Sequence, residues 1–451
     1  MAVIPGERQI VNHGQRGDIA HRFNRRAVKV STAQELVLAA ARAVPCGVET
    51  VPLRQCSGRR LAHKLEATCD WPPFARSGLD GYAVRAADCA EASPGQPATL
   101  RVVDSVAAGG VATAAVEPGT AVRIMTGAAV PDGADAVVML EQTAEALLAG
   151  GEAAAVQVKH AARPGQNIAP RGEEFRLGSA LAEPGTRLRP GHVALLGTFG
   201  YADVPVYRRP RVAVFATGSE LLPVASPLAP GQIRDSNSPM VAAMAEHSGA
   251  EVISFGTLPD EPGEVAAALA RALEDADLIV TTGGVSVGDH DVMADIVRAL
   301  RQGSLSAANP VMDDPRSRVL FDRVAMRPGS PTSAAVLSGK LLVALSGNPG
   351  ACFVGFELFV RPAIHAMMGV EEALPRRATA HLASGITKGS PHERYVRARL
   401  AQDEEGRLLA DPLAYNKSSM MASLADADCL AIIPSGSQGA EQGEKIDVIL
   451  I

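Results

Sequence analysis

Four short clusters combine glycine with hydroxyl, amide or carboxylate side chains, and each one follows a run of apolar residues or precedes a helix. They are residues 217–220 (Thr-Gly-Ser-Glu), 235–237 (Asp-Ser-Asn), 282–289 (Thr-Gly-Gly-Val-Ser-Val-Gly-Asp) and 346–350 (Ser-Gly-Asn-Pro-Gly). Glycine lets the backbone approach a ligand closely and aim its N–H groups at it, while Ser, Thr and Asn add neutral donors. This combination suits a phosphate or another oxyanion. The stretch 282–289 matches neither a Walker A sequence nor a dinucleotide fingerprint.

Carboxylates accompany these donors. Glu220, Asp235, Asp289 and Asp291 fall within or directly after the clusters. Mg²⁺ prefers hard oxygen ligands and commonly bridges phosphates, so this pattern indicates a magnesium site beside an oxyanion site. The alternative for each acid taken singly is a solvated loop residue or a helix cap, and Asp291 could simply cap the helix that follows it.

The elements between the clusters alternate between strand and helix. Apolar runs predict strands at 211–216, 251–255, 277–282 and 341–345, and helical patterns predict helices beginning at Ser238-Pro239 and spanning 261–273, 291–300 and 352–368. Such alternation indicates a parallel sheet covered on both faces. Ligands of these sheets bind at the carboxyl ends of the strands. One glycine cluster alone is as well explained by a tight turn, but several at one sheet edge favour a binding site.

The rest of the chain is mostly β-rich. A capping box at Ser31 or Thr32 predicts a first helix that stops near Gly47. Short β-runs separated by Gly and Pro occupy 71–160, and residues 161–208 contain a short helical patch at 192–196. Residues 372–451 alternate β-runs with polar turns, which indicates a small barrel or sandwich. Two further turns, Asp80-Gly81 and Thr126-Gly127, read as plain turns when taken alone.

The composition excludes several function classes. The 451 residues carry a net charge of −6 and only 4% aromatic residues, which argues against nucleic acid and anionic membranes as partners. No apolar run approaches the roughly 18 residues of a membrane span. The six cysteines form no CxxC pair or zinc pattern, so free thiols in a reducing cytoplasm are expected.

Six strings together resemble the molybdopterin molybdenumtransferase family, which includes bacterial MoeA and the E domain of gephyrin. They occur in the family's order and the resemblance covers about residues 31–451. The strings are PPFARSGLDGYAV at 72–84, RIMTGAAVPDGADAVV at 123–138, QNIAPRGEEF at 166–175, PRVAVFATGSEL at 210–221, TTGGVSVGDHD at 281–291 and SGNPGA at 346–351.

The resemblance implies a multidomain α/β plus β fold. A flexible extension (1–29) would precede an extended β-rich dimerisation domain (30–70 and 165–208) with an inserted β-domain (71–164). A molybdopterin-binding α/β domain (209–370) and a C-terminal β-barrel (371–451) would follow. It also implies a homodimer whose active cleft lies between the α/β domain of one subunit and the inserted domain of the other.

The implied reaction uses Mg²⁺, molybdate and adenylylated molybdopterin, and releases AMP as the metal enters the dithiolene. Asp80, Thr126, Glu220 and Asp291 match positions that the family uses for activity. Asp289, Asp291 and Glu220 would hold Mg²⁺, and Thr126, Arg327 and Ser418 would help to bind molybdate. The substrate-binding groups would include Gly283, Gly284, Ser286, Gly288, Asp235, Gly347, Asn348 and Pro349. Partners would be the molybdopterin adenylyltransferase and molybdoenzyme maturation proteins.

The sequence departs from the family pattern at the proposed anion site. The family usually has Lys-Pro-Gly-Lys-Pro where this chain has residues 327–331, Arg-Pro-Gly-Ser-Pro. Arg327 can still bind an oxyanion bidentately, whereas Ser330 cannot replace a charge. This departure motivates the alternative of a carrier that binds molybdopterin or the finished cofactor without catalysing insertion. Measuring AMP release distinguishes the enzyme from the non-catalytic carrier.

Overall fold

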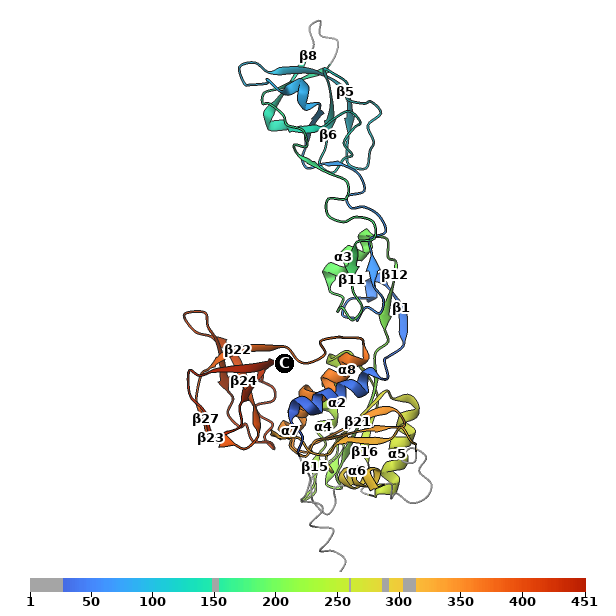
Figure 1. Cartoon of the computed structure of the whole chain (residues 1–451), viewed down its shortest axis with the longest axis vertical. Helices are drawn as coiled ribbons and strands as arrows, with labels where there is room; N and C mark the ends of the chain where they lie inside the picture. Colours follow the sequence, from blue (N-terminus) through green and yellow to red (C-terminus); the bar gives the residue numbers. More distant parts are fainter. Residues whose placement is uncertain (1–26, 148–153, 259–260, 286–291, 303–313) are drawn as a thin grey trace, which may run out of the picture.

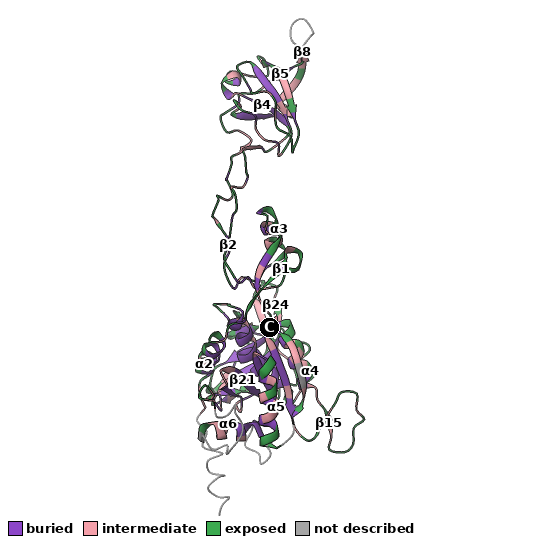
Figure 2. Cartoon of the chain, turned by 90° about the vertical axis from the view of Figure 1, so that its right-hand side faces the viewer, coloured by how far each residue is buried: buried purple, intermediate pink, exposed green. Residues whose placement is uncertain are grey.

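The chain is strongly elongated (Figure 1). The structure, a computed structural model, describes residues 27–147, 154–258, 261–285, 292–302 and 314–451. An α/β domain and a C-terminal β-domain lie side by side at one end, a small β-rich domain lies in the middle, and a further β-domain lies at the far end. Figure 2 shows that buried residues gather in separate groups, around β21 in the α/β domain and around β4 at the far end.

A six-stranded sheet with the order β16-β13-β17-β21-β20-β18 forms the centre of the α/β domain. Strands β13 (Arg211–Thr217), β16 (Glu251–Leu258), β17 (Leu278–Thr282) and β21 (Lys340–Leu345) pair in parallel, which confirms the four predicted strands. These four strands form the predicted parallel sheet, and an antiparallel pair extends it at one edge. Strand β20 (Ser333–Leu337) runs antiparallel to both β21 and β18 (Arg318–Phe321). Positive φ angles of 48° at Ser338 and 86° at Gly339 form the tight turn that reverses the chain between β20 and β21.

Helices cover both faces of this sheet because alternate residues of each strand point to opposite sides. Val212 and Val214 pack in one core cluster and Ala213 in another. Helices α5 (Pro262–Asp275) and α6 (Val292–Gln302) cover the face that Ala213 shares. The other face is covered by α2 (Val30–Arg42), α4 (Asn237–His247) and the continuous α7 (Pro349–Gly355), π-helical segment Phe356–Val360 and α8 (Arg361–Met367).

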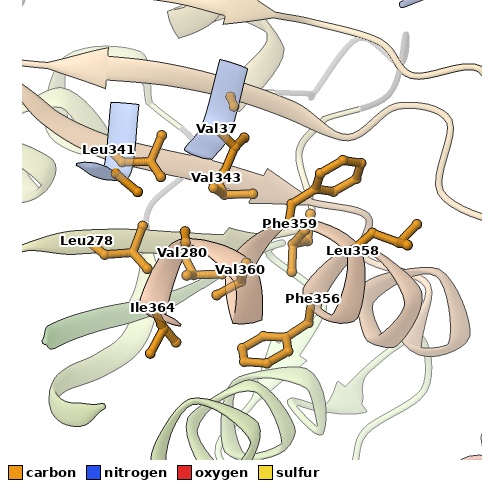
Figure 3. Close-up of a cluster of buried hydrophobic side chains, with 14 of the residues drawn as sticks. Val37, Leu278, Val280, Leu341, Val343, Phe356, Leu358, Phe359, Val360 and Ile364 are labelled. Carbon is orange, nitrogen blue, oxygen red and sulfur yellow. The ribbon is translucent and has the colours of Figure 1, made fainter. Parts of the chain in front are cut away.

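Helix α2 packs inside the α/β domain, although the sequence placed it in the extended domain. Val37 lies against Val343 of β21 and near Phe359 of the π-helical segment (Figure 3). Contacts with α8 and β21 hold it there, some 300 residues away in sequence. We therefore propose to assign α2 to the α/β domain and to keep the other domain boundaries as predicted.

Two predicted helix caps were wrong. Lys29 is the N-cap of α2 and makes no side-chain cap hydrogen bond, and α2 ends at Arg42, before Gly47. In α4 the N-cap is Ser236, and the Asp235 carboxylate accepts the N–H of Ser238 at 3.0 Å. The sequence predicted Ser238, directly before Pro239, as the cap of this helix, but the carboxylate of Asp235 serves that start instead.

The extended domain is built from short strand pairs. Strand β1 (Val48–Pro52) pairs with β12 (Asp203–Tyr207), β2 (Leu65–Glu66) with β11 (Ala180–Ala182), and β3 (Arg76–Ser77) with β10 (Ile168–Ala169), all antiparallel. The short helix η1 (Leu53–Gln55) and α3 (Pro190–Thr198), which contains the predicted helical patch, complete it. Leu61, Leu196 and Phe199 are in its core.

The domain at the far end contains a six-stranded sheet with the order β7-β4-β6-β5-β9-β8. Its β5–β6 pair is parallel and the other pairs are antiparallel. The elements are β4 (Gly81–Val84), η2 (Ala86–Cys89), β5 (Ala98–Val106), β6 (Thr120–Ile124), β7 (Ala136–Met139), η3 (Leu140–Gln142), β8 (Thr143–Leu147) and β9 (Ala154–Val158).

The C-terminal domain is a closed β-barrel, as predicted. Strands β24, β25, β22, β28 and β26 pair in that order, and a further pairing of β26 with β24 closes the ring. Strand β19 (Met326–Arg327) extends from the α/β domain and pairs with β24. The bounds are β22 (Arg377–Leu382), β24 (Glu393–Gln402), β25 (Leu408–Pro412), β26 (Cys429–Ile433) and β28 (Lys445–Leu450). Strands β23 (Ile386–Ser390) and β27 (Gly436–Ala440) form a separate two-stranded antiparallel sheet. Among the described residues, no helix is long and apolar enough to span a membrane.

Candidate functional site

A cavity of about 810 Å³ opens at the carboxyl ends of β13, β17 and β21. We refer to it as the sheet-edge cavity. It brings together all four clusters singled out in the sequence, since Glu220, Asp235, Gly283 and Asn348 are among its lining residues. Gly284, Gly347 and Pro349 line it as well. The short parallel pair β14 (Leu221–Leu222) and β15 (Ile233–Arg234) forms part of its wall.

Glycine is required where two of these loops touch. Gly283 has a φ of +92°, and a Cβ there would lie 2.5 Å from the main-chain oxygen of Thr217. Gly284 has a φ of +61°, and its Cβ would meet the Thr217 hydroxyl at 2.7 Å. Both positions therefore need a residue without a side chain. As a result, the loop after β17 lies directly against the end of β13, and both backbones face the cavity.

Two carboxylates line the sheet-edge cavity, Glu220 and Asp235. The Glu220 carboxylate folds back over Gly218, where an added Cβ would lie 2.7 Å from Oε2. Beside them, Asn237 donates from Nδ2 to the main-chain oxygen of Gly347 at 2.8 Å. Its Oδ1 is buried and has no hydrogen-bond partner within the described part of the chain. Asn237 thus joins two of the clusters and leaves an acceptor free beside the cavity.

Four predicted site residues, Ser286, Gly288, Asp289 and Asp291, lie outside the described residues. The last described residue before them, Val285, lines the sheet-edge cavity, and the first described residue after them, Val292, begins α6. Among the described residues, no group of three His, Cys, Asp or Glu side chains is arranged to hold a metal ion. Any magnesium site here would therefore combine Glu220 or Asp235 with ligands from elsewhere.

A second cavity, of about 730 Å³, lies between the α/β domain and the barrel. It shares Pro331, Ser346, Asn348 and Ser419 with the sheet-edge cavity, so the two adjoin. We refer to it as the barrel-side cavity. The predicted oxyanion residues Arg327 and Ser418 line it, together with three further cations, and no described Asp or Glu does. These cations are Lys388, Arg394 and Lys417.

Arg327 and Arg394 are register partners where β19 pairs with β24. Burial and the charge of Arg327 lower the pKa of Arg394. Two guanidinium groups beside each other without a carboxylate form a favourable site for an anion. Ser330, which stands where the family has a second lysine, donates its hydroxyl to the main-chain oxygen of Val324 at 2.8 Å. The positive charge expected from position 330 is supplied here by the barrel.

Residue types and motifs alone did not predict that the C-terminal domain contributes cations to the barrel-side cavity. Lys388, Arg394 and Lys417 lie on strands and a loop of the C-terminal domain whose sequence shows only an alternating pattern. Their position opposite the α/β domain depends on contacts between segments far apart in the chain. Arg397 was also missed. It is fully buried, and its guanidinium donates to Ser423 Oγ at 2.8 Å and to the main-chain oxygens of Tyr415 and Lys417.

Arg397 therefore holds the loop that carries Ser418. The main-chain oxygen of Ser418 in turn accepts the N–H of Gly350 at 2.8 Å, which fastens the barrel loop to the start of α7. A signal for Arg397 does exist in the sequence, since an arginine in an otherwise apolar strand segment, Tyr395–Ala398, needs polar partners.

Asp80 and Thr126 lie together, but in the domain at the far end of the chain. Asp80 follows β3, and Thr126 follows β6. The N–H and the hydroxyl of Thr126 both donate to Asp80 Oδ1, each at 2.7 Å. These bonds lower the pKa of Asp80, the backbone bond most strongly. In Figure 1 the domain that contains this pair, marked by β6, lies at the opposite end of the chain from β21 and β24, near which the two cavities lie.

Three family models cover most of the chain. Residues 28–200 match the MoeA N-terminal region (domains I and II), residues 213–366 match a probable molybdopterin binding domain, and residues 379–451 match the MoeA C-terminal region (domain IV). A molybdopterin molybdenumtransferase of Bacillus subtilis (strain 168) is 45% identical over 89% of this chain and 90% of its own length. One of Staphylococcus aureus (strain COL) is 41% identical over the same shares.

Solved structures agree with these matches. The molybdopterin biosynthesis MoeA protein of Pyrococcus horikosii superimposes with a TM-score of 0.77 at 30% sequence identity. The superposition covers 94% of this chain and 99% of that protein.

Proposed function

Because the chain belongs to the molybdopterin molybdenumtransferase family, we propose that its two adjoining cavities bind adenylylated molybdopterin and molybdate. The chain is a transferase of molybdenum cofactor biosynthesis, and molybdopterin is its substrate. The alternative of a non-catalytic carrier has no support among its relatives, which are named as transferases.

The contrast in charge between the adjoining cavities carries this proposal. The sheet-edge cavity has two carboxylates, Glu220 and Asp235, and one cation, Arg234. The barrel-side cavity has four cations and no carboxylate among its described lining residues. Molybdate is a dianion, so we assign it to the barrel-side cavity with Arg327, Arg394 and Ser418. The pterin and the pyrophosphate belong to the sheet-edge cavity, against the backbone of Gly283, Gly284 and Gly347. The shared wall would place the dithiolene beside molybdate.

Mg²⁺ fits the donors of the sheet-edge cavity. Glu220 and Asp235 offer carboxylate oxygens, Asn237 Oδ1 offers an amide oxygen without a partner among the described residues, and the pyrophosphate would add more. We propose Glu220 with Asp289 and Asp291 as its protein ligands. When bound, Mg²⁺ neutralises charge on the phosphates that separate as water attacks one phosphorus and AMP leaves. The residues of the chain hold the pyrophosphate in line for that attack.

The position of Asp80 and Thr126 supports a homodimer. Their domain lies at the opposite end of the chain from the α/β domain and the barrel, so we propose that they reach the cleft of a second copy. Asp80 would orient water or the oxygens of molybdate there. We also propose a cytoplasmic location, which suits the six free cysteines, and contact with the molybdopterin adenylyltransferase and molybdoenzyme maturation proteins.

The decisive experiment is AMP release from adenylylated molybdopterin with molybdate and Mg²⁺. Glu220→Gln and Asp291→Ala should each lower the rate at least about 100-fold, because metal-assisted charge stabilisation supplies several kcal/mol and about 1.4 kcal/mol is a factor of ten. Glu404→Gln, an exposed change on the barrel, is the control and should leave the rate unchanged. AMP release that does not depend on Glu220 or Asp291 would contradict the assignment.

A further inference from the structure

A third cavity, of about 120 Å³, lies where the extended domain meets the α/β domain. It shares no lining residue with the two cavities described above. The extended domain contributes the loop 58–60 and Arg187, and Arg209 comes from the segment that connects the two domains. The α/β domain contributes the end of α4 at 247–249, and also Arg361, His365 and Met368. We refer to it as the junction cavity.

The described residues that line the junction cavity include five arginines and no Asp or Glu. Two of the five are neutralised, because Arg59 pairs with Glu49 and Arg361 makes a bidentate pair with Glu357. The other three, Arg60, Arg187 and Arg209, make no ion pair with any described carboxylate. Arg60 reaches only the main-chain oxygen of Gly185, at 3.2 Å.

These unmatched guanidinium groups repel one another. Burial lowers the pKa of Arg60, and the charges of Arg187 and Arg376 lower it further. Burial and then the charges of Arg60, Arg361 and Arg187 lower the pKa of His365 to about 4. Concentrated positive charge from separate elements destabilises a fold unless an anion offsets it. Guanidinium groups are also the side chains best suited to bind a tetrahedral oxyanion through pairs of N–H donors.

We propose that the junction cavity binds a small divalent oxyanion of the phosphate class and that the bound anion ties the extended domain to the α/β domain. The volume sets the size, since about 30 Å³ per water molecule allows a few waters or one tetrahedral oxyanion but leaves no room for a nucleotide. Arg60 and Arg187 bind it from one domain, and Arg209 binds it from the connecting segment. From the α/β domain, Arg361 donates through Nη1, since only its Nε and Nη2 pair with Glu357. The site is separate from the proposed function and does not depend on it.

Thermal unfolding of the full chain tests this site. Inorganic phosphate is titrated at constant ionic strength with chloride, in an Arg327→Ala background that weakens the barrel-side cavity. At 100 times its Kd, a bound anion should raise Tm by roughly 5 °C or more, and the rise should saturate. Parallel titrations with sulfate and molybdate show which oxyanion the site prefers, and acetate, a monoanion, should have little effect.

Substitutions then locate the response. Arg187→Ala and Arg209→Ala remove exposed side chains without ion pairs among the described residues, so the chain should still fold. Each should raise the Kd for phosphate at least about tenfold, the loss expected for one hydrogen bond to a charged group. Arg187→Glu places a carboxylate in the cluster and should abolish the response. Arg101→Ala, exposed in the far domain, is the matched control and should respond like the Arg327→Ala background.

Two results would overturn the proposal. One is a Tm that shows no saturable rise with phosphate, or a rise that is the same in Arg187→Ala and Arg209→Ala as in the background. The other is a Tm that rises with protein concentration and ignores phosphate, which would assign the arginines to a carboxylate of a second copy. A failure of AMP release, by contrast, would bear only on the two adjoining cavities.

Discussion

Arg327 and Arg394 face the barrel-side cavity as neighbours without a carboxylate between them. Arg327→Ala should raise the molybdate concentration for half-maximal AMP release by at least about tenfold, because one lost charged hydrogen bond is about 1.5–3 kcal/mol. Arg394→Ala should have an effect of similar size, although Ser330 was the position where sequence suggested a missing charge. The measurement is the molybdate dependence of turnover at fixed ionic strength.

The matched control for these variants is Arg399→Ala. Arg399 lies on the same strand, β24, but it is exposed and pairs with Asp426 outside the cavity. Its loss should not change the molybdate dependence. If Arg327→Ala and Arg394→Ala behave like this control, molybdate binds elsewhere and the assignment of the barrel-side cavity fails.

His365 makes α8 sensitive to acid. Its pKa in the folded chain is about 4, below the ordinary 6.5, because of burial and the charges of Arg60, Arg361 and Arg187. Between these values the unfolded chain binds more protons than the folded chain, so the free energy of unfolding falls as the pH drops from about 6.5 to about 4. His365→Asn should flatten this part of the stability profile.

The profile is best followed by thermal unfolding at a series of pH values, with His63→Asn as control. His63 is exposed in the extended domain, so its replacement should leave the slope unchanged. An unaltered slope in His365→Asn would mean that other groups dominate the acid sensitivity.

The π-helical segment Phe356–Val360 contains a buried acid. Glu357 is fully buried and binds Arg361, one helical turn later, through two hydrogen bonds of 2.6 Å. Burial raises the pKa of Glu357, and Arg361 partly offsets that rise. Glu357→Leu should cost about 3 kcal/mol, the lower end for breaking a buried pair, since Arg361 keeps some contact with water. The double variant Glu357→Leu/Arg361→Met should recover part of that loss.

Hydrogen exchange of the α8 amides is the suitable measurement. The single tryptophan, Trp71, lies in the extended domain and does not report on the α/β domain. Equal protection of α8 in the wild type and in Glu357→Leu would show that the pair contributes nothing to stability.

At the scale of the molecule, the long separation between Asp80 and the cavities makes a prediction about mixed dimers. Asp80→Asn and Glu220→Gln should each be inactive alone. When they are mixed, one cleft of each heterodimer carries both defects and the other carries neither. Random pairing should therefore restore about one quarter of wild-type AMP release. Heterodimers that form but restore nothing would show that Asp80 does not act across the interface.

The sequence by itself determined the local parts of this protein. The parallel strands of the α/β domain are mainly apolar runs, and the loop after β17 needs glycine for its own backbone angles, as Gly283 does with a φ of +92°. Such features depend on neighbouring residues, so they can be read without a structure. The pairing of Asp80 with Thr126 was suggested only by the family resemblance, because the two turns alone carry no distinguishing signal.

Only the tertiary structure decided what lies opposite those loops. The antiparallel strand β20, the insertion of α2 against Val343 and the meeting of Arg394 with Arg327 all join segments far apart in the chain. The arginines of the junction cavity come together in the same way, from the extended domain, the connecting segment and α8. The spacing of apolar residues shows which face of a helix or strand is apolar, but it does not show which distant element packs against that face. The packing of the whole chain determines which elements meet, and therefore which charged side chains line each cavity.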